Sequence, residues 1–381
     1  MRSLKLGPIL PRRTSVWPAP SDLDLLRAAL LDSDLARQAW DRWRLATGGF
    51  PDAAQRRLLP LVEWNLRRSS GVDAVPEEPG FVELAPIQAE ALAEAGRSAL
   101  AALANAGLKP LVIKGFALAH LYYPHPALRR MADIDLLVRP KELERAGEAL
   151  ETVGWKLDEP EPQSRLLHLH GIAYRRADSP EIDLHFRALE ESAAPDVDQG
   201  FISRAIPASI GGVTTWTLTP PDHLFCVCIH GLRWNAVAPI HWVADAAMIL
   251  RRSFGPREWE IMLDEARCRR LALPLERALR LVRTEIGGPV PGEILDALSR
   301  MRSEKWRERW EVAARMRPPS LLRGIFLHWC GLAREEGGLS MFRRLWRFPG
   351  HLRELWALDH IWQVPVAAIQ KSFMRMATRR K

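Results

Sequence analysis

Residues 131–138, MADIDLLV, and residues 180–186, PEIDLHF, decide the fold that we expect for this chain. Successive side chains of a β-strand point to opposite faces, so residues two apart share a face. As strands, both segments have one acidic face and one apolar face. The acidic faces carry Asp133 and Asp135 in the first segment and Asp183 in the second. The apolar faces carry Ile134, Leu136, Val138, Ile182, Leu184 and Phe186.

If these two strands are neighbours, their acidic faces point to the same side of one sheet, ~4.8 Å apart. Carboxylates this close repel one another strongly unless a cation lies between them. Oxygen ligands at this density suit Mg²⁺ or Mn²⁺. The pattern therefore predicts a divalent metal site at Asp133, Asp135 and Asp183. A lone Asp-X-Asp is weak evidence, and the alternative is an acidic, solvent-facing sheet surface that never meets a nucleotide.

A second segment, LVIKGFALAHLYY at residues 111–123, has the composition of a buried strand, a tight turn and a short helix. Gly115 would let backbone N–H groups approach a phosphate at the start of that helix. Lys114 could supply a positive charge to a triphosphate. Arg129 and Arg130, which precede the first carboxylate, either reach phosphate or lie on a solvated loop.

The segments LVIKGFALAHLYY, LRRMADIDLLV and EIDLHF together resemble the uncharacterised bacterial nucleotidyltransferase family of the DNA-polymerase-beta-like superfamily. Members of that family have a Lys-Gly after the first strand, an Arg before an Asp-Ile-Asp-Leu-Leu-Val strand, and a later Asp-Leu-His strand. The resemblance covers roughly residues 110–186 and is weaker in the flanking helices. In the wider superfamily a Gly or Ser usually follows the loop glycine, whereas here Phe116 follows Gly115 and the interval to the carboxylates is longer.

The resemblance implies a role for each matching residue. Asp133 and Asp135 would bind two metal ions, and Asp183 would bind the catalytic ion and help to activate the acceptor oxygen. The expected nucleotide-binding residues are Lys114, Gly115 and Arg129.

The expected function is metal-dependent transfer of a nucleoside monophosphate from an NTP such as ATP to an acceptor, with release of pyrophosphate. Two Mg²⁺ or Mn²⁺ ions bound ~4 Å apart can activate the attacking oxygen and stabilise the leaving pyrophosphate. The acceptor stays open among a small molecule, a sugar, a peptide and a protein, and nucleic acid is not excluded. The alternatives are a glycosyltransferase that binds a nucleotide-sugar through its Asp-X-Asp, and a non-catalytic scaffold of the same fold.

The rest of the chain predicts an α+β protein with helical regions on both sides of a small mixed sheet. We expect an N-terminal helical region at residues 1–106, a nucleotidyltransferase core at 107–219 and a C-terminal helical domain at 220–381. Ser21 is the expected N-cap of the first helix and Gly107 the C-cap of the helix that precedes the core. Five strands are expected, in LKPLVIKG, MADIDLLVRP, LHLHGIAYRR, PEIDLHFRA and VTTWTL.

The chain of 381 residues has a formal net charge of +8, which favours anionic partners or indicates only a solvated basic surface. Its four cysteines lack the spacing of a zinc site, so free thiols in a reducing cytoplasm are expected. No apolar run approaches the ~18 residues that span a bilayer, and the apolar stretch of residues 1–14 is too short for a signal sequence and is interrupted by Pro8 and Pro11. These features favour a soluble cytoplasmic protein. Peripheral membrane contact through the basic, aromatic residues 342–356 is less favoured than a packed helix.

Several histidines leave their roles open. His168, His170 and His185 could form a transition-metal site, but no fixed ligand spacing supports one. His185 is expected behind the carboxylates or facing the substrate. His230 and Asp245, in the later helices, either contact the base or acceptor or brace two helices.

Overall fold

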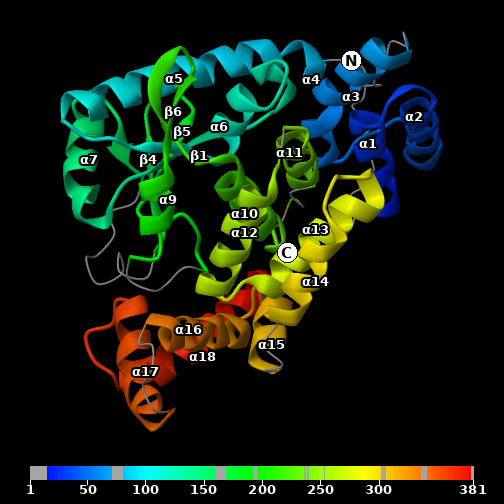
Figure 1. Ribbon diagram of the computed structural model, residues 1–381. Coiled ribbons are helices and arrows are strands. Elements are labelled where there is room, and N and C mark those ends of the chain that lie inside the picture. The colour runs from blue at the N-terminus through cyan, green and yellow to red at the C-terminus, as the bar shows by residue number, and fades with distance from the viewer. Residues whose placement is uncertain are drawn as a thin grey trace, which may run out of the picture.

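The computed structural model describes residues 15–70, 80–158, 169–191, 196–235, 237, 240–252, 254–301, 306–335 and 341–378. The expected α+β class is confirmed, with one mixed sheet in the middle of the chain and helices before and after it (Figure 1). The predicted features of residues 1–14 and of His168 lie outside the described residues.

The sheet has seven strands in the order β3-β4-β5-β2-β1-β7-β6. β2 pairs parallel with β5 and β1 pairs parallel with β7, and the other neighbours are antiparallel. The strands are β1 (Leu111–Ile113), β2 (Asp133–Leu137), β3 (Lys156–Leu157), β4 (Gly171–Arg175), β5 (Glu181–His185), β6 (Ile206–Ile210) and β7 (Val213–Thr217). All five expected strands are present. The two that were not expected are β3, which is very short, and the edge strand β6, which contains Pro207.

One face of the sheet is apolar, as the alternation predicts. Ile134 and Leu136 of β2 and Ile182 and Leu184 of β5 are completely buried. They pack with helices α5 (Ala85–Asn105) and α7 (Leu143–Glu151) in one hydrophobic cluster. In Figure 1, α5 runs across the top of the molecule above the sheet. The opposite face of β2 and β5 is left for polar groups.

Phe116 explains the unusual residue that follows the loop glycine. It lies in helix α6 (Lys114–Leu121) and is buried in the same apolar cluster. A Cβ added at Gly96 of α5 would lie 2.7 Å from the Phe116 ring, and one at Gly211 would lie 3.0 Å from it. Both glycines therefore leave the space that this ring fills, and Phe116 is a core residue directed away from the polar face.

The N-terminal and C-terminal helices pack on each other to form a second, larger core. Helix α1 contacts α11 and α13, and Arg27 of α1 forms a 2.7 Å ion pair with Glu285 of α13. The N-terminal elements are α1 (Pro20–Leu30), α2 (Ser33–Thr47), η1 (Gln55–Leu58), α3 (Leu59–Ser70) and α4 (Gly80–Glu83). Two short 3-10 helices, η2 (Pro126–Leu128) and η3 (Pro140–Glu142), flank β2, and α9 (Gln199–Arg204) precedes β6.

From Pro220 onward, every regular element in the described residues is a helix. Helices α16 to α18 form the lower part of Figure 1, away from the sheet. The helices are α10 (Pro220–Gly231), α11 (His241–Leu250), α12 (Pro256–Arg269), α13 (Ala272–Ile286), α14 (Gly292–Met301), α15 (Trp306–Arg315), α16 (Leu321–Glu335), α17 (Met341–Leu355) and α18 (Gln363–Thr378).

The expected helix ends are half correct. Helix α5 ends before Gly107, which has a φ of 69° as a left-handed C-terminal glycine should. The prediction of Ser21 as an N-cap was wrong, because Pro20 takes the first helical position, where its fixed φ and missing N–H fit. The backbone N–H of Ala19 donates to the side chain of Asp22 instead.

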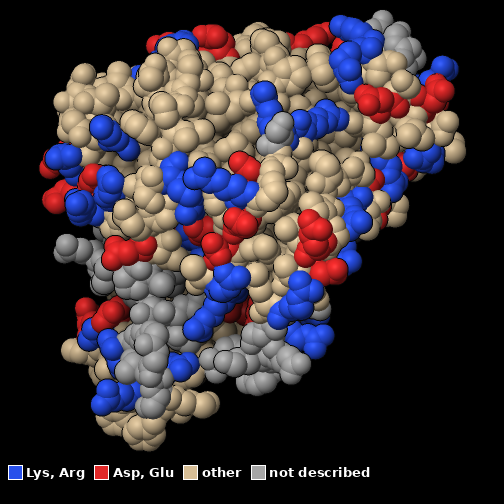
Figure 2. All heavy atoms as spheres, in the orientation of Figure 1, with Lys and Arg blue, Asp and Glu red and all other residues tan. Residues whose placement is uncertain are grey.

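The surface charge is mixed. Figure 2 shows lysines and arginines interspersed with acidic residues, so the net charge of +8 is not gathered into one basic area on this face. Cys226, Cys228 and Cys330 are buried and Cys268 is exposed, and all four thiols are free, as expected. No helix in the described part of the chain is long and apolar enough to cross a bilayer.

His223 of α10 provides a test of this packing. Its ring is buried, with Nε2 3.0 Å from Oγ1 of Thr217, and burial lowers its pKa to about 3. The unfolded chain therefore gains a proton near pH 6.5 that the folded chain does not. This histidine's contribution to stability is complete above pH 6.5 and decreases as the pH falls toward 3.

We expect His223→Gln to reduce the loss of unfolding free energy between pH 7 and pH 5 by about 2 kcal/mol. Urea denaturation at both pH values measures this difference. His360→Gln, at an exposed position, serves as the control. An unchanged pH dependence in the His223 variant would contradict the burial of a neutral imidazole.

Candidate functional site

The acidic face is built by the parallel pairing of β2 and β5. In this register Asp133 lies opposite Glu181, and Asp135 lies opposite Asp183. The two strands are therefore neighbours with their acidic residues on one side, as predicted. Because the apolar residues between them are fixed in the core, a shift by one residue would expose that core.

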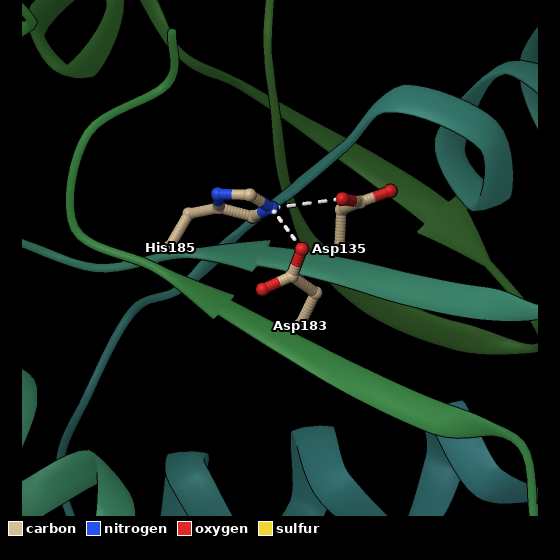
Figure 3. A group of neighbouring side chains, drawn as sticks. All are labelled: Asp135, Asp183 and His185. Atoms are coloured by element: carbon tan, nitrogen blue, oxygen red, sulfur yellow. Dashed lines mark hydrogen bonds and ion pairs between the residues drawn. The ribbon is translucent and has the colours of Figure 1, made fainter. Parts of the chain in front are cut away.

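Asp135, Asp183 and His185 form a compact group, which we call the carboxylate–histidine cluster. Nε2 of His185 points between the two carboxylates, 2.8 Å from Oδ1 of Asp135 and 3.1 Å from Oδ2 of Asp183 (Figure 3). One ligand atom from each of the three residues lies within 4.8 Å of the others. The imidazole is completely buried, and its Nδ1 has no hydrogen-bond partner among the residues that the structure describes.

Lys114 neutralises part of this negative charge. Its ammonium Nζ lies 2.6 Å from Oδ1 of Asp135 and 3.0 Å from Nε2 of His185. Its φ of 50° is left-handed, a conformation that costs a non-glycine residue about 1–3 kcal/mol. The turn between β1 and α6 therefore accepts backbone strain at the residue whose side chain reaches the cluster.

The ionisation of the cluster follows from these contacts. Burial would raise the pKa of Asp135, but Lys114 and His185 hold it well below its usual range. Burial would also raise the pKa of Asp183, and the hydrogen bond from His185 outweighs this and lowers it. For His185, burial and Lys114 act to lower the pKa, while the two carboxylates outweigh them and raise it. Both carboxylates are therefore ionised at neutral pH.

Asp133 lies outside the compact group. It is the first residue of β2 and remains exposed, and in the described residues the group of potential ligands does not include it. Reduced hydration is the main cause that raises the pKa of Asp133, and the negative charges of Asp135 and Asp183 add to it. The positive charges of Lys114 and Arg129 only partly offset this rise. Asp133 thus lies beside the cluster at its solvent side.

Gly171 of β4 makes room for the cluster. It lies opposite His185 in the sheet. An added Cβ would lie 2.8 Å from Oδ1 of Asp183 and 2.8 Å from Nδ1 of His185. Any side chain at this position would displace one of these two groups.

The donor set fits a divalent cation. Two ionised carboxylates on neighbouring strands would supply hard oxygen ligands, and Nε2 of the buried imidazole beside them would supply a nitrogen ligand once it releases its proton. Carboxylates suit Mg²⁺ and Mn²⁺, and the imidazole favours Mn²⁺ of the two. The ammonium of Lys114 already occupies the place of a cation against Asp135.

Arg129 lies in a buried network rather than on a solvated loop. Its Nε and Nη2 donate to the two carboxylate oxygens of Asp245 in α11, at 3.0 and 2.9 Å. The hydroxyl of Tyr123 donates to Asp245 at 2.7 Å. An added Cβ at Gly115 would lie 2.6 Å from Nη1 of Arg129. Gly115 therefore admits the guanidinium, and Asp245 braces the segment before β2 against the C-terminal helices.

Helix α10 brings further groups near the cluster. Burial lowers the pKa of His230 well below its ordinary value, and Lys114 lies close enough to lower it further. Within the described part of the chain, Nδ1 of His230 has no hydrogen-bond partner. The His170 ring lies 5.3 Å from the His185 ring, and burial lowers its pKa to about 4. Two neutral imidazoles thus lie near the cluster, His230 in α10 and His170 directly before β4.

The comparison with known protein families identifies the chain. The family described as "Uncharacterised nucleotidyltransferase" matches residues 52–286, well over half of the 381 residues. The protein belongs to this nucleotidyltransferase family. The match includes Lys114, both β2 carboxylates and the Asp183-His185 pair.

Two solved structures resemble this nucleotidyltransferase. The solution structure of the antibiotic-resistance factor ANT(2'')-Ia is 18% identical, covers 48% of this chain and 94% of its own, and has a TM-score of 0.34. The crystal structure of an antigenic nucleotidyltransferase-like protein from Paracoccidioides brasiliensis is 15% identical and covers 54% of this chain and 91% of its own, with a TM-score of 0.36. No protein of curated function matches the chain. Both TM-scores are below 0.5, so the family match alone identifies the chain.

Sequence reasoning missed three features of this nucleotidyltransferase site. It did not predict that His185 bridges Asp135 and Asp183, although strand alternation puts His185 on the same face. It did not predict the ion pair of Lys114 with Asp135, because 21 residues separate them. No local signal points to Gly171, whose importance depends on the register of β4 against β5.

Gly171→Ala is expected to weaken Mn²⁺ binding at least about tenfold, because the new methyl group displaces Asp183 or His185. Isothermal titration calorimetry with Mn²⁺ measures the effect. The control is Gly324→Ala in α16, where an added Cβ meets nothing within 4 Å. Equal Mn²⁺ affinity in the wild type and Gly171→Ala would show that the cluster does not hold the ion.

Arg129→Met should lower the unfolding free energy by about 3–5 kcal/mol, because it leaves the Asp245 carboxylate buried without its partner. The double variant Arg129→Met/Asp245→Leu should recover part of this loss. Urea denaturation of the wild type, both single variants and the double variant gives the coupling. A strictly additive double variant would argue against a buried ion pair.

Proposed function

We propose that this protein is a metal-dependent enzyme that transfers a nucleoside monophosphate from an NTP, such as ATP, to an acceptor and releases pyrophosphate. The observation that carries the proposal is the meeting of Asp135 and Asp183 from neighbouring parallel strands, inside the region that matches the nucleotidyltransferase family. The cation is Mg²⁺ or Mn²⁺, and it would polarise the α-phosphate and the attacking oxygen.

In this proposal the three carboxylates have different roles in binding the metal. Asp135 and Asp183 would hold the metal ion that faces the reacting phosphate, and Asp133 would complete the metal site from its exposed position beside them. Nε2 of His185 bridges the two carboxylates and so holds them in position before a metal ion binds. Because the imidazole of His185 is buried, its ring keeps one orientation and does not turn toward solvent.

The transfer itself needs one bond formed and one bond broken. The acceptor oxygen attacks the α-phosphorus, and the bond from that phosphorus to the oxygen bridging to the β-phosphate breaks. Pyrophosphate leaves with the electron pair. The proton of the acceptor passes to a carboxylate, and Asp183 is ionised at neutral pH and therefore free of a proton of its own.

Lys114 would change partners during the cycle. Against Asp135 it offsets the charge of the empty carboxylates. When a cation replaces its ammonium there, the side chain is released toward the β- and γ-phosphates, where a point charge binds well. Gly115 and Arg129 would border the same triphosphate, Gly115 through its backbone and Arg129 through Nη1, which is not bonded to Asp245.

Two further features support this function over the alternatives. A glycosyltransferase of the Asp-X-Asp type normally has several strand–helix units before that motif, whereas β1 is the one strand before Asp133 in the described residues. A degenerate scaffold would not need an intact pair of ionised carboxylates.

We retain the division into residues 1–106, 107–219 and 220–381 as a proposal, with NTP and an acceptor as the partners of the core.

The test is calorimetric binding of a non-hydrolysable NTP with and without Mg²⁺. Metal-dependent binding is expected in the wild type and should weaken at least about tenfold in Asp135→Asn and in Asp183→Asn. Lys114→Met should weaken NTP binding while strengthening binding of Mn²⁺ alone, because the competing ammonium is gone. Glu144→Gln, exposed on α7, is the control. The proposal would be contradicted if NTP bound equally well with and without Mg²⁺, or equally well to the wild type, Asp135→Asn and Asp183→Asn.

A further inference from the structure

A cavity lies next to the first residues of β2 and β5, where Ala132 and Pro180 line it. It has a volume of about 430 Å³ and opens between η1, α5, the segment before β2 and Pro180. Arg56, Arg57 and Arg130 provide its polar wall, and apolar residues such as Leu92 and Met131 provide the rest. None of its lining residues is acidic.

Arg130 is held in this wall although Arg57 repels it. Nε and Nη2 of Arg130 both donate to Oε1 of Gln88 in α5, which fixes the guanidinium. Partial burial and the charge of Arg57 lower the pKa of Arg130. Arg57 is exposed and has no carboxylate partner among the residues that the structure describes. Several positive side chains on one wall of a cavity favour the binding of an anion. Arginine can bind a phosphate with two parallel hydrogen bonds.

The position of this cavity separates it from the triphosphate site. Ala132 and Pro180 line it, and they directly precede Asp133 and Glu181, the paired first residues of β2 and β5. Its α5 wall belongs to the helix that covers the apolar face of the sheet. Lys114, by contrast, reaches the carboxylates on the opposite, polar face. Asp133 thus lies between two sites of positive charge.

We propose that this cavity, the arginine pocket, binds the phosphate group of a small phosphorylated acceptor, so that the acceptor extends past Ala132 toward Asp133. This inference rests on the proposed nucleotidyl transfer and names its acceptor class. The volume is within the range of small-molecule sites. Its apolar wall would contact the uncharged part of the acceptor, and the arginines would bind the phosphate.

The test measures binding of inorganic phosphate and of glucose 6-phosphate, with glucose as the uncharged match, by calorimetry without nucleotide. Phosphate and glucose 6-phosphate should bind the wild type, whereas glucose should not. Arg57→Met and Arg130→Met should each weaken both at least about tenfold, and Arg57→Lys should weaken them less. Arg145→Met, exposed on α7, should change nothing. Equal binding by all variants, or none by the wild type, would overturn the proposal.

A second arm separates the acceptor from the NTP as the source of the phosphate. Binding of a non-hydrolysable NTP with Mg²⁺ should be unchanged in Arg57→Met and Arg130→Met. A parallel loss of NTP affinity would assign the arginine pocket to the nucleotide and overturn its assignment to the acceptor. Loss of NTP binding in Asp135→Asn alone tests the proposed function separately, so the two proposals can fail independently. Thermal melting of the Arg130 variant, whose side chain is half-buried, excludes a folding defect.

Discussion

The parallel pairing of β2 and β5 is the constraint on which the rest of the site depends. It places Asp135 directly opposite Asp183, an arrangement that the mutual repulsion of two partly buried carboxylates opposes. The protein makes it tolerable from three sides. The apolar faces of both strands are fixed under α5 and α7, His185 bridges the two carboxylates, and Lys114 brings a positive charge to them. Packing thus fixes the positions of the two carboxylates, and the neighbouring positive and hydrogen-bonding groups reduce their repulsion.

A second buried charge pair connects the sheet to the C-terminal helices. Arg129 precedes β2 in the chain and pairs with Asp245 of α11 inside the protein. Its guanidinium also fills the space that Gly115 leaves. The turn that carries Lys114, the segment that leads to Asp133 and the helix α11 are thereby held in one arrangement. Helical regions distant in sequence thus contribute to the geometry of the polar face.

The sequence predicted what strand periodicity and local chemistry determine. The α+β class, the five main strands, their faces and the neighbouring carboxylates followed from alternation and length. The short β3 and the edge strand β6 carry too little periodicity to be recognised. At the site, Asp135 and Asp183 were predicted to meet and do. The partners of Lys114, Arg129 and Gly171 could not be predicted, because each lies far away in the chain and depends on a register or helix position that no local pattern encodes.

The residues of the cluster lie far apart in the sequence, and this affects how the chain folds. Asp135 and His185 are 50 residues apart, and Lys114 and His185 are 71 apart. Contacts of such long sequence separation form slowly, since the loss of chain entropy precedes the gain from contact. The cluster is therefore complete only once the central sheet has assembled, and a cation bound there stabilises the finished fold over every earlier state. Metal affinity would then serve as a reporter of folding as well as of chemistry.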